Sequence, residues 1–190
     1  MFKHEMLCFC GLQQQLGLKS SKNAPNVPKR HTFVPQLTNM LTYSCIPFDQ
    51  LDTHMLYEIM RLRQEVFVVE QQCCYLDADR LDYRSWQVIG LDDNGALLAH
   101  SRLLPRGSAY PEYPSIGRVM TSGRVRRSGE GKRLLAYSLE QCATLFPGEA
   151  IKIGAQLYLT DFYRSFGFNP VRDTYMEDGI EHIHMIRQPD

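Results

Sequence analysis

The sequence has no long apolar run and no excess of charge of either sign. Its apolar runs are a few residues long, far short of the roughly 20 that a membrane helix needs, and none near the N-terminus suits a secretory signal. Lys plus Arg number 21, and Asp plus Glu also number 21. A neutral chain has no global field to hold nucleic acid or an anionic membrane. We therefore expect a cytoplasmic protein that binds neither nucleic acid nor membrane.

Cysteine pairs with metal-ligand spacing are also lacking. The six cysteines are spaced as C-x-C, as C-C and singly, never as C-x2-C, and no His-x3-His lies at zinc-finger distance. We expect no metal site and reduced thiols, as is usual in the cytosol. Cys73 and Cys74 have no activating base nearby in the sequence, so we expect them to be unreactive.

The chain is long enough for one domain, and its first part differs in composition from the rest. Of its 190 residues, 44% are apolar and 22% are charged, which excludes general disorder. Residues 11–30 hold a glutamine run, two prolines and four Lys or Arg but no acid, without periodicity. We predict a disordered tail over 1–40 and one domain over 41–190. A start codon assigned upstream of a true start at Met40, or an organelle-targeting segment, are alternative interpretations of the tail.

From residue 41 onward, the hydrophobic patterns predict elements in the order β-α-β-β-β-α-β-α-β-β. We place the strands at 41–48, 86–91, 96–104, 116–121, 151–156, 168–175 and 180–187. We place the helices, from apolar residues three and four apart, at 53–70, 130–145 and 157–166. Asp52 or Thr53 caps the first helix. Asp93-Asn94-Gly95 predicts a tight hairpin turn between the second and third strands.

The most informative segment is Arg126-Arg127-Ser128-Gly129-Glu130-Gly131, between a predicted strand and a predicted helix. Its glycines let a ligand approach the backbone, and the first amides of a helix have no intrahelical acceptor. With the helix dipole, these amides form an anion site. The surrounding basic residues are Arg126, Arg127, Lys132 and Arg133. The pattern is neither a dinucleotide fingerprint nor a P-loop, and alone it fits equally well a glycine-bearing turn with a solvated basic rim.

Two linked motifs resemble those of a known family. Arg126-x-x-Gly129-x-Gly131 is similar to motif A of the GNAT acyltransferase superfamily, and Phe162-Tyr163-Arg164-Ser165-Phe166-Gly167-Phe168 is similar to its motif B. Four further segments resemble ElaA-like members of that superfamily: 62–71, 75–79, 116–119 and 175–183. The resemblance covers about 41–190 and none of the tail.

The chain departs from the family pattern at three positions. Arg127 replaces a usual glycine, Glu130 replaces an apolar residue, and Gly123 stands where proline is usual. Glu130 either places a carboxylate near incoming phosphates, which weakens cofactor binding, or stabilises the start of the helix. Gly129 and Gly131, which allow close approach to the backbone, are both kept.

The resemblance implies a mixed α/β GNAT fold: a mostly antiparallel mixed sheet, splayed at an acetyl-CoA cleft and flanked by helices. The pantetheine arm would bond to the free backbone edge of one strand, and the pyrophosphate to the loop that follows. The implied cofactor-binding residues are Val119, Met120, Thr121, Arg126, Arg127, Ser128, Gly129, Glu130, Gly131 and Lys132. Acetyl-CoA is the implied co-substrate, without a metal.

The implied reaction is direct attack of a small-molecule or peptide amine on the thioester in a ternary complex. Tyr163 resembles the family tyrosine that protonates the leaving thiolate; the alternative is a packed aromatic. Glu70, which ends the first predicted helix, is our candidate base, against a plain surface carboxylate. His182 and His184 share one face of the last strand, as a base or as packed histidines.

Two arginines are candidates for binding a substrate carboxylate. Arg63 and Arg118 either have that role or pair with acids such as Asp77 and Asp79. We favour pairing, because three acids in the short loop 71–84 need partners.

Two other functions stay open. An acyl-homoserine-lactone synthase relative would share the fold but use an acyl carrier protein. A non-catalytic module that binds CoA or a partner would fit the unusual Arg127 and Glu130. The acceptor amine is left open, as is the oligomeric state, including a homodimer.

Overall fold

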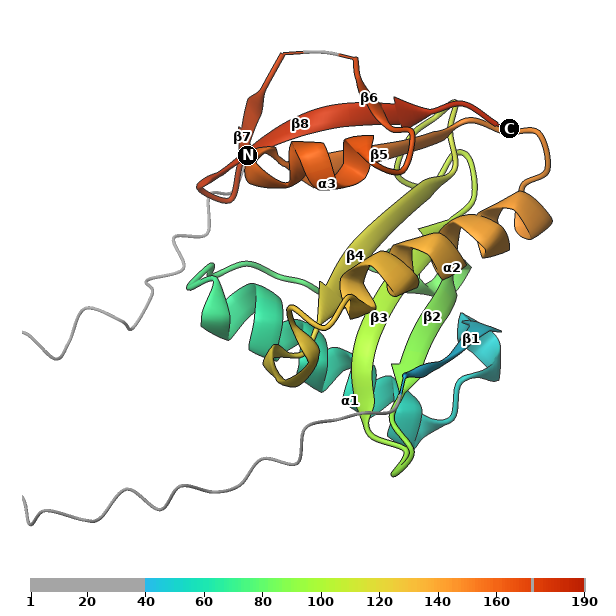
Figure 1. Ribbon diagram of the computed structural model, residues 1–190, viewed down its shortest axis with the longest axis vertical. Coiled ribbons are helices and arrows are strands. Elements are labelled where there is room, and N and C mark those ends of the chain that lie inside the picture. Colours follow the sequence, from blue (N-terminus) through green and yellow to red (C-terminus); the bar gives the residue numbers. More distant parts are fainter. Residues whose placement is uncertain (1–39, 172, 190) are drawn as a thin grey trace, which may run out of the picture. The chain divides into compact units, whose positions relative to one another are not determined.

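The computed structural model describes residues 40–171 and 173–189, so all of the predicted tail except Met40 lies outside the described residues. The described chain forms an eight-stranded sheet in the order β1-β2-β3-β4-β5-β8-β6, with β7 also paired to β8 (Figure 1). The strands are β1 (Thr42–Pro47), β2 (Trp86–Leu91), β3 (Leu97–Leu104), β4 (Ser115–Thr121), β5 (Ile151–Gln156), β6 (Asn169–Pro170), β7 (Tyr175–Glu177) and β8 (Ile180–Arg187). Among the strands of the described residues, only β4 and β5 pair in parallel. The predicted mixed, mostly antiparallel sheet is confirmed.

Helices cover both faces of the sheet. The helices are α1 (Thr53–Arg63), α2 (Glu130–Leu145) and α3 (Thr160–Arg164). Figure 1 looks onto the face covered by α2 and α3, and α1 packs on the other face. On β3, Leu97 packs in the α1 cluster and Leu98 in the α2 cluster, the alternation expected of a strand buried on both faces. Among the described residues, no helix has the length and apolar character needed to cross a membrane.

Helical structure covers the range predicted for the first helix, but it changes from α-helix to π-helix along that range. The Asp52 carboxylate accepts a hydrogen bond from Met55 N at 2.7 Å, as the cap prediction requires. After α1, a π-helical segment over Gln64–Glu70 continues the chain. Apolar spacing predicts a helix for both parts, but it cannot separate the two hydrogen-bond patterns. The result is that Glu70 ends a π-helical segment, a feature often found at functional sites.

The continuous strand predicted over 168–175 is wrong. The described chain forms ladder pairs with β8 at β6 (Asn169–Pro170) and again at β7 (Tyr175–Glu177), and Val171 N also donates to His184 O at 3.0 Å. Pro170 has no backbone N–H to donate to a ladder, which suits its place in a short strand at the edge of the sheet. The helix predicted over 157–166 is also shorter, with a 3-10 turn at Leu157–Leu159 before α3.

The parallel strands β4 and β5 separate into a fork. They pair at one position, Ser115 with Lys152, where Lys152 N also donates to Pro114 O at 3.0 Å. Beyond this pair, β4 stays with β3, whereas β5 stays with β8 (Figure 1). The edge of β4 that faces β5 therefore has no strand partner past Ser115 in the described chain. This is the splay that the family resemblance predicts.

Candidate active site

The loop at the mouth of the fork has the geometry of an anion site. Arg127 and Gly129 have φ angles of 64° and 91°, which turn the chain into α2. The N–H groups of Lys132 and Arg133 both donate to Gly129 O, at 3.0 and 3.2 Å. The amides of the first turn, before Lys132, are therefore those that a helix leaves without an intrahelical acceptor. A Cβ atom at Gly131 would meet nothing within 4 Å, so space is open for a ligand beside the backbone.

The Glu130 side chain points into the protein. Its carboxylate accepts hydrogen bonds from Tyr43 Oη and from an Arg133 N–H, both at 2.7 Å, and is 7% exposed. Burial and the bond to Glu130 raise the pKa of Tyr43 well above its ordinary value. Of the two interpretations of Glu130, this geometry fits a residue that fixes the start of α2.

Arg126 links the loop to two other parts of the site. Its Nε donates to Thr121 O at 3.2 Å, and a terminal nitrogen pairs with the Glu70 carboxylate at 2.5 Å. The candidate base is therefore occupied by an arginine of the candidate phosphate loop. Arg127 and Lys132 have no ion pair among the described residues, so their charges remain available to a ligand. Ser128 Oγ donates to Val125 O at 2.6 Å and stabilises the turn.

The free edge of β4 presents its backbone into the fork. A register shift against β3 falls between His100 and Arg102, opposite Arg118, whose φ is 52°. Beyond this irregularity come Val119, Met120 and Thr121, whose outer edge has no strand partner in the described part of the chain. Backbone donors and acceptors on such an edge bind an extended ligand as an added strand would.

Tyr163 lies in α3 with a buried ring. The ring packs against Phe162 and Phe168, with centroids 5.1 and 5.9 Å away, and the residue is 7% exposed. Burial raises the pKa of Tyr163 to about 12, so the phenol keeps its proton at neutral pH. In the described chain its hydroxyl has no hydrogen-bond partner. A protonated, unpaired phenol can donate to a ligand.

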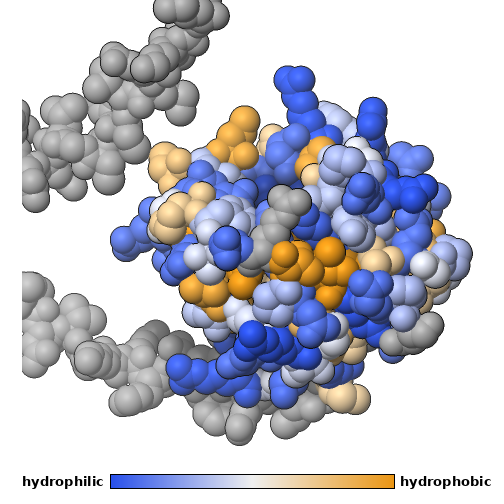
Figure 2. Space-filling view, turned by 90° about the horizontal axis from the view of Figure 1, so that it is seen from above, coloured by the Kyte–Doolittle hydropathy of each residue, from blue (hydrophilic) through white to orange (hydrophobic). Residues whose placement is uncertain are grey.

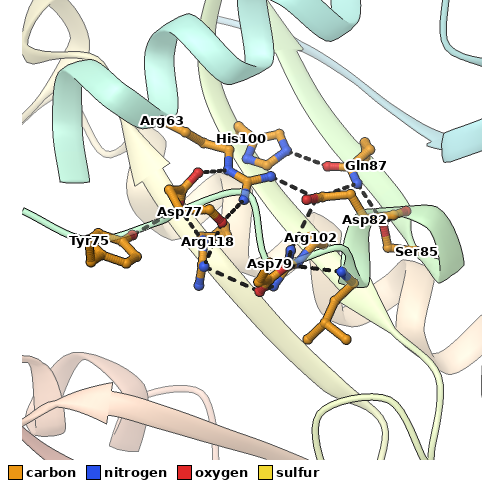
Figure 3. Close-up of polar contacts among 11 residues, drawn as sticks. Arg63, Tyr75, Asp77, Asp79, Asp82, Ser85, Gln87, His100, Arg102 and Arg118 are labelled. Carbon is orange, nitrogen blue, oxygen red and sulfur yellow. Dashed lines mark hydrogen bonds and ion pairs between the residues drawn. The ribbon is translucent and has the colours of Figure 1, made fainter. Parts of the chain in front are cut away.

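A network of three arginines and three aspartates fastens the loop before β2 to the sheet (Figure 3). Arg63 is fully buried, and its Nε bonds to Asp77 at 2.7 Å. Arg118 Nε bonds to the other oxygen of Asp77, also at 2.7 Å. The predicted pairing of Arg63 and Arg118 with Asp77 and Asp79 is confirmed, and Asp79 bonds to Arg118 at 3.3 Å.

The sequence reasoning missed further members of this network. Arg102 bonds to both oxygens of Asp79 at 2.7 Å, and Asp82 pairs with Arg63 at 2.7 Å and Arg102 at 3.2 Å. Burial opposes the charge of Asp82, but the two arginines outweigh it and lower its pKa. The sequence does hold one signal of these contacts, because Arg102 stands within the apolar run of β3. A charge buried in such a run needs a partner of opposite sign.

Three comparisons place these features among known proteins. A family model described as an acetyltransferase (GNAT) domain matches residues 64–188. The UPF0039 protein sll0451 of Synechocystis is 43% identical over 77% of this chain and 94% of its own. Protein ElaA of Escherichia coli is 38% identical over 78% of this chain and 97% of its own. The crystal structure of Escherichia coli ElaA matches with a TM-score of 0.73 over 78% of this chain and all of that one. The structure of an acyl-CoA N-acyltransferase from Pseudomonas aeruginosa matches with a TM-score of 0.72 at 36% identity, over 77% of this chain and 99% of that one.

Proposed function

The chain belongs to the GNAT acetyltransferase family, and on that premise we propose that it transfers an acetyl group from acetyl-CoA to an amine. One observation carries the proposal. A strand edge that no described strand pairs with runs along the fork to a helix start whose amides have no intrahelical acceptor. An extended pantetheine arm with a pyrophosphate at one end fits this combination.

The residues of the fork suit the parts of acetyl-CoA. Val119, Met120 and Thr121 offer backbone groups to the amides of the pantetheine arm. The turn over 126–131 offers amides to the pyrophosphate, while Arg127 and Lys132 add charge. Ser128 and Glu130 contribute through the backbone, because their side chains bond inside the protein.

We propose that the amine attacks the thioester directly. The C–N bond forms, the C–S bond breaks, and the departing thiolate takes the phenol proton of Tyr163. An alkyl amine of pKa ~10.4 is about one part in 2,000 neutral at pH 7, which costs roughly 4–5 kcal/mol unless a base removes the proton. Tyr163 regains its proton from solvent after thiol release.

Glu70 is the proposed base, but its ion pair with Arg126 must break before its carboxylate can accept a proton. In the free protein its carboxylate is held by Arg126. A pyrophosphate at the loop competes for the same guanidinium, because Arg126 belongs to that loop. We propose that acetyl-CoA binds first and draws Arg126 away, so that Glu70 becomes free to accept the proton of the amine.

The test is turnover of acetyl-CoA with a panel of amines, read as free thiol and as acetylated product by mass spectrometry. We expect thiol release that depends on the amine and matches the product formed. Turnover with acyl carrier protein as the donor but not with acetyl-CoA would instead indicate a homoserine-lactone-synthase-like enzyme. Tight acetyl-CoA binding without turnover of any amine would indicate a binding module.

A further inference from the structure

A group of aromatic side chains lies beside the fork on the face opposite α2 and α3. On β5, Ile153 and Ala155 pack in the α2 cluster, so Gly154 between them faces the other side. A Cβ atom at Gly154 would lie 2.5 Å from Tyr175 Oη and 3.3 Å from Tyr110 Oη. Both phenol hydroxyls thus converge on a strand position where a Cβ atom would require Tyr175 to move.

Two histidines of β8 extend this group. The Tyr175 ring lies over His184 with centroids 4.5 Å apart and stacks on His182 at 5.7 Å. Tyr110 meets His184 edge to face at 5.7 Å. We call these four residues the aromatic pocket. A hollow of about 570 Å³ adjoins them, lined by Val171, Asp173, Tyr175 and His184.

The aromatic pocket is continuous with the proposed reaction site. Gly154 is two residues beyond Lys152, the last position at which β5 pairs with β4. Two residues further along the same face, Gln156 Nε2 contacts Gln71 Oε1 at 3.5 Å, and Gln71 follows the proposed base. A ligand in the pocket therefore lies between the closed end of the fork at Lys152 and the Glu70 segment.

The charges around the pocket favour a cation. Asp173 lines the hollow, and the Glu177 carboxylate lies close enough to add to burial in raising the pKa of Tyr175 to about 12. Lys152 places its ammonium 4.4 Å from the Tyr110 ring centroid, so one cation already lies on an aromatic face here. A ligand carboxylate would thus meet two acids against one ammonium.

Apolar surface is also exposed beside the hollow. The end of the domain viewed in Figure 2 shows hydrophobic patches bordered by hydrophilic residues. Val171, which lines the hollow, is 44% exposed. A ligand with an apolar body and one cationic end would contact both kinds of surface.

Resting on the proposed function, we propose that the aromatic pocket binds the acceptor, and that the acceptor is a small organic cation. It carries a primary ammonium on an apolar or aromatic body and has no carboxylate. The rings of Tyr175 and the histidines hold the cation and its body, and Asp173 adds attraction at the rim.

The experiment uses the full chain and two matched pairs of compounds: tyramine against tyrosine, and cadaverine against lysine. Members of each pair differ only by the carboxylate. Acetylation is followed with acetyl-CoA, and tyramine binding is measured separately by calorimetry in the presence of CoA. We expect kcat/KM at least tenfold higher for each amine than for its amino acid.

Two variants locate the effect. Tyr175→Leu is expected to raise the KM for tyramine roughly three- to tenfold, and Asp173→Asn roughly two- to fivefold, with the latter effect weaker at high salt. Both should leave the Kd of acetyl-CoA unchanged. Asp49→Asn, an exposed acid beyond β1 at the other edge of the sheet, is the control and should change neither.

The outcomes separate the two proposals. If the wild-type protein does not bind acetyl-CoA, the proposed function is wrong. The calorimetric titration with tyramine then still tests whether the aromatic pocket binds the acceptor. Equal rates for amines and amino acids, no binding of tyramine, or a wild-type KM in both variants would overturn the pocket assignment.

Discussion

Tyr163 combines a buried ring with a hydroxyl that has no partner among the described residues. Tyr163→Phe removes only the oxygen, so the packing stays and the melting temperature should change by less than about 2 °C. If the phenol protonates the thiolate, kcat should fall by roughly 10²–10⁴-fold with the Kd of acetyl-CoA unchanged. Tyr57→Phe, at an exposed position on α1, is the control. A kcat within threefold of wild type, when chemistry limits turnover, would remove the proposed role.

His100 predicts a pH dependence of stability. It is fully buried in β3, and burial lowers its pKa to about 3. Between about pH 6.5 and 3 the unfolded chain binds a proton that the folded chain excludes, so the free energy of unfolding should fall by up to about 1.4 kcal/mol per pH unit as pH decreases. His100→Gln keeps a donor for Gln87 and should flatten the curve between pH 6.5 and 5 in urea titrations. Identical slopes in both proteins would contradict this assignment.

At the scale of elements, local patterns predict much of the fold and little of the network. The strand at 86–91 and the helix at 130–145 match β2 and α2, because each has a complete periodic pattern and clear stops. The interrupted strand over 168–175 and the π-helical segment depend on which partner each backbone group finds. The contacts of Arg102 with Asp79 and Asp82 join residues about 20 positions apart, which no local pattern records.

The arginine–aspartate network predicts a large loss of stability from one substitution. Asp82→Asn leaves the buried Arg63 and Arg102 short of a counter-charge, so unfolding should become easier by about 3–5 kcal/mol in denaturant titration. Asp49→Asn, exposed and outside the network, should change stability by less than about 0.5 kcal/mol. A loss below about 1 kcal/mol for Asp82→Asn would show that the network contributes little.

At the scale of the whole molecule, we propose that residues 41–190 form the catalytic domain without the first 40. The sheet, the fork and the network are all formed by residues within that range. A chain that begins at Met40 should keep the melting temperature and the acetyl-CoA affinity of the full chain. A loss of either would show that the first 39 residues contribute to the domain.

The central claim is that acetyl-CoA binds in the fork with its pyrophosphate at the start of α2. Gly131 gives the most direct test, because a Cβ there meets nothing within 4 Å and its φ is not in the left-handed region. An acid in the first turn of a helix stabilises the helix, yet it repels a phosphate at the same place. Gln50→Glu, which adds the same charge beyond β1, is the control. In calorimetric titrations with acetyl-CoA, the account predicts that Gly131→Asp keeps or raises the melting temperature and weakens binding at least 100-fold, whereas Gln50→Glu binds as wild type does. A wild-type Kd for Gly131→Asp would contradict the account.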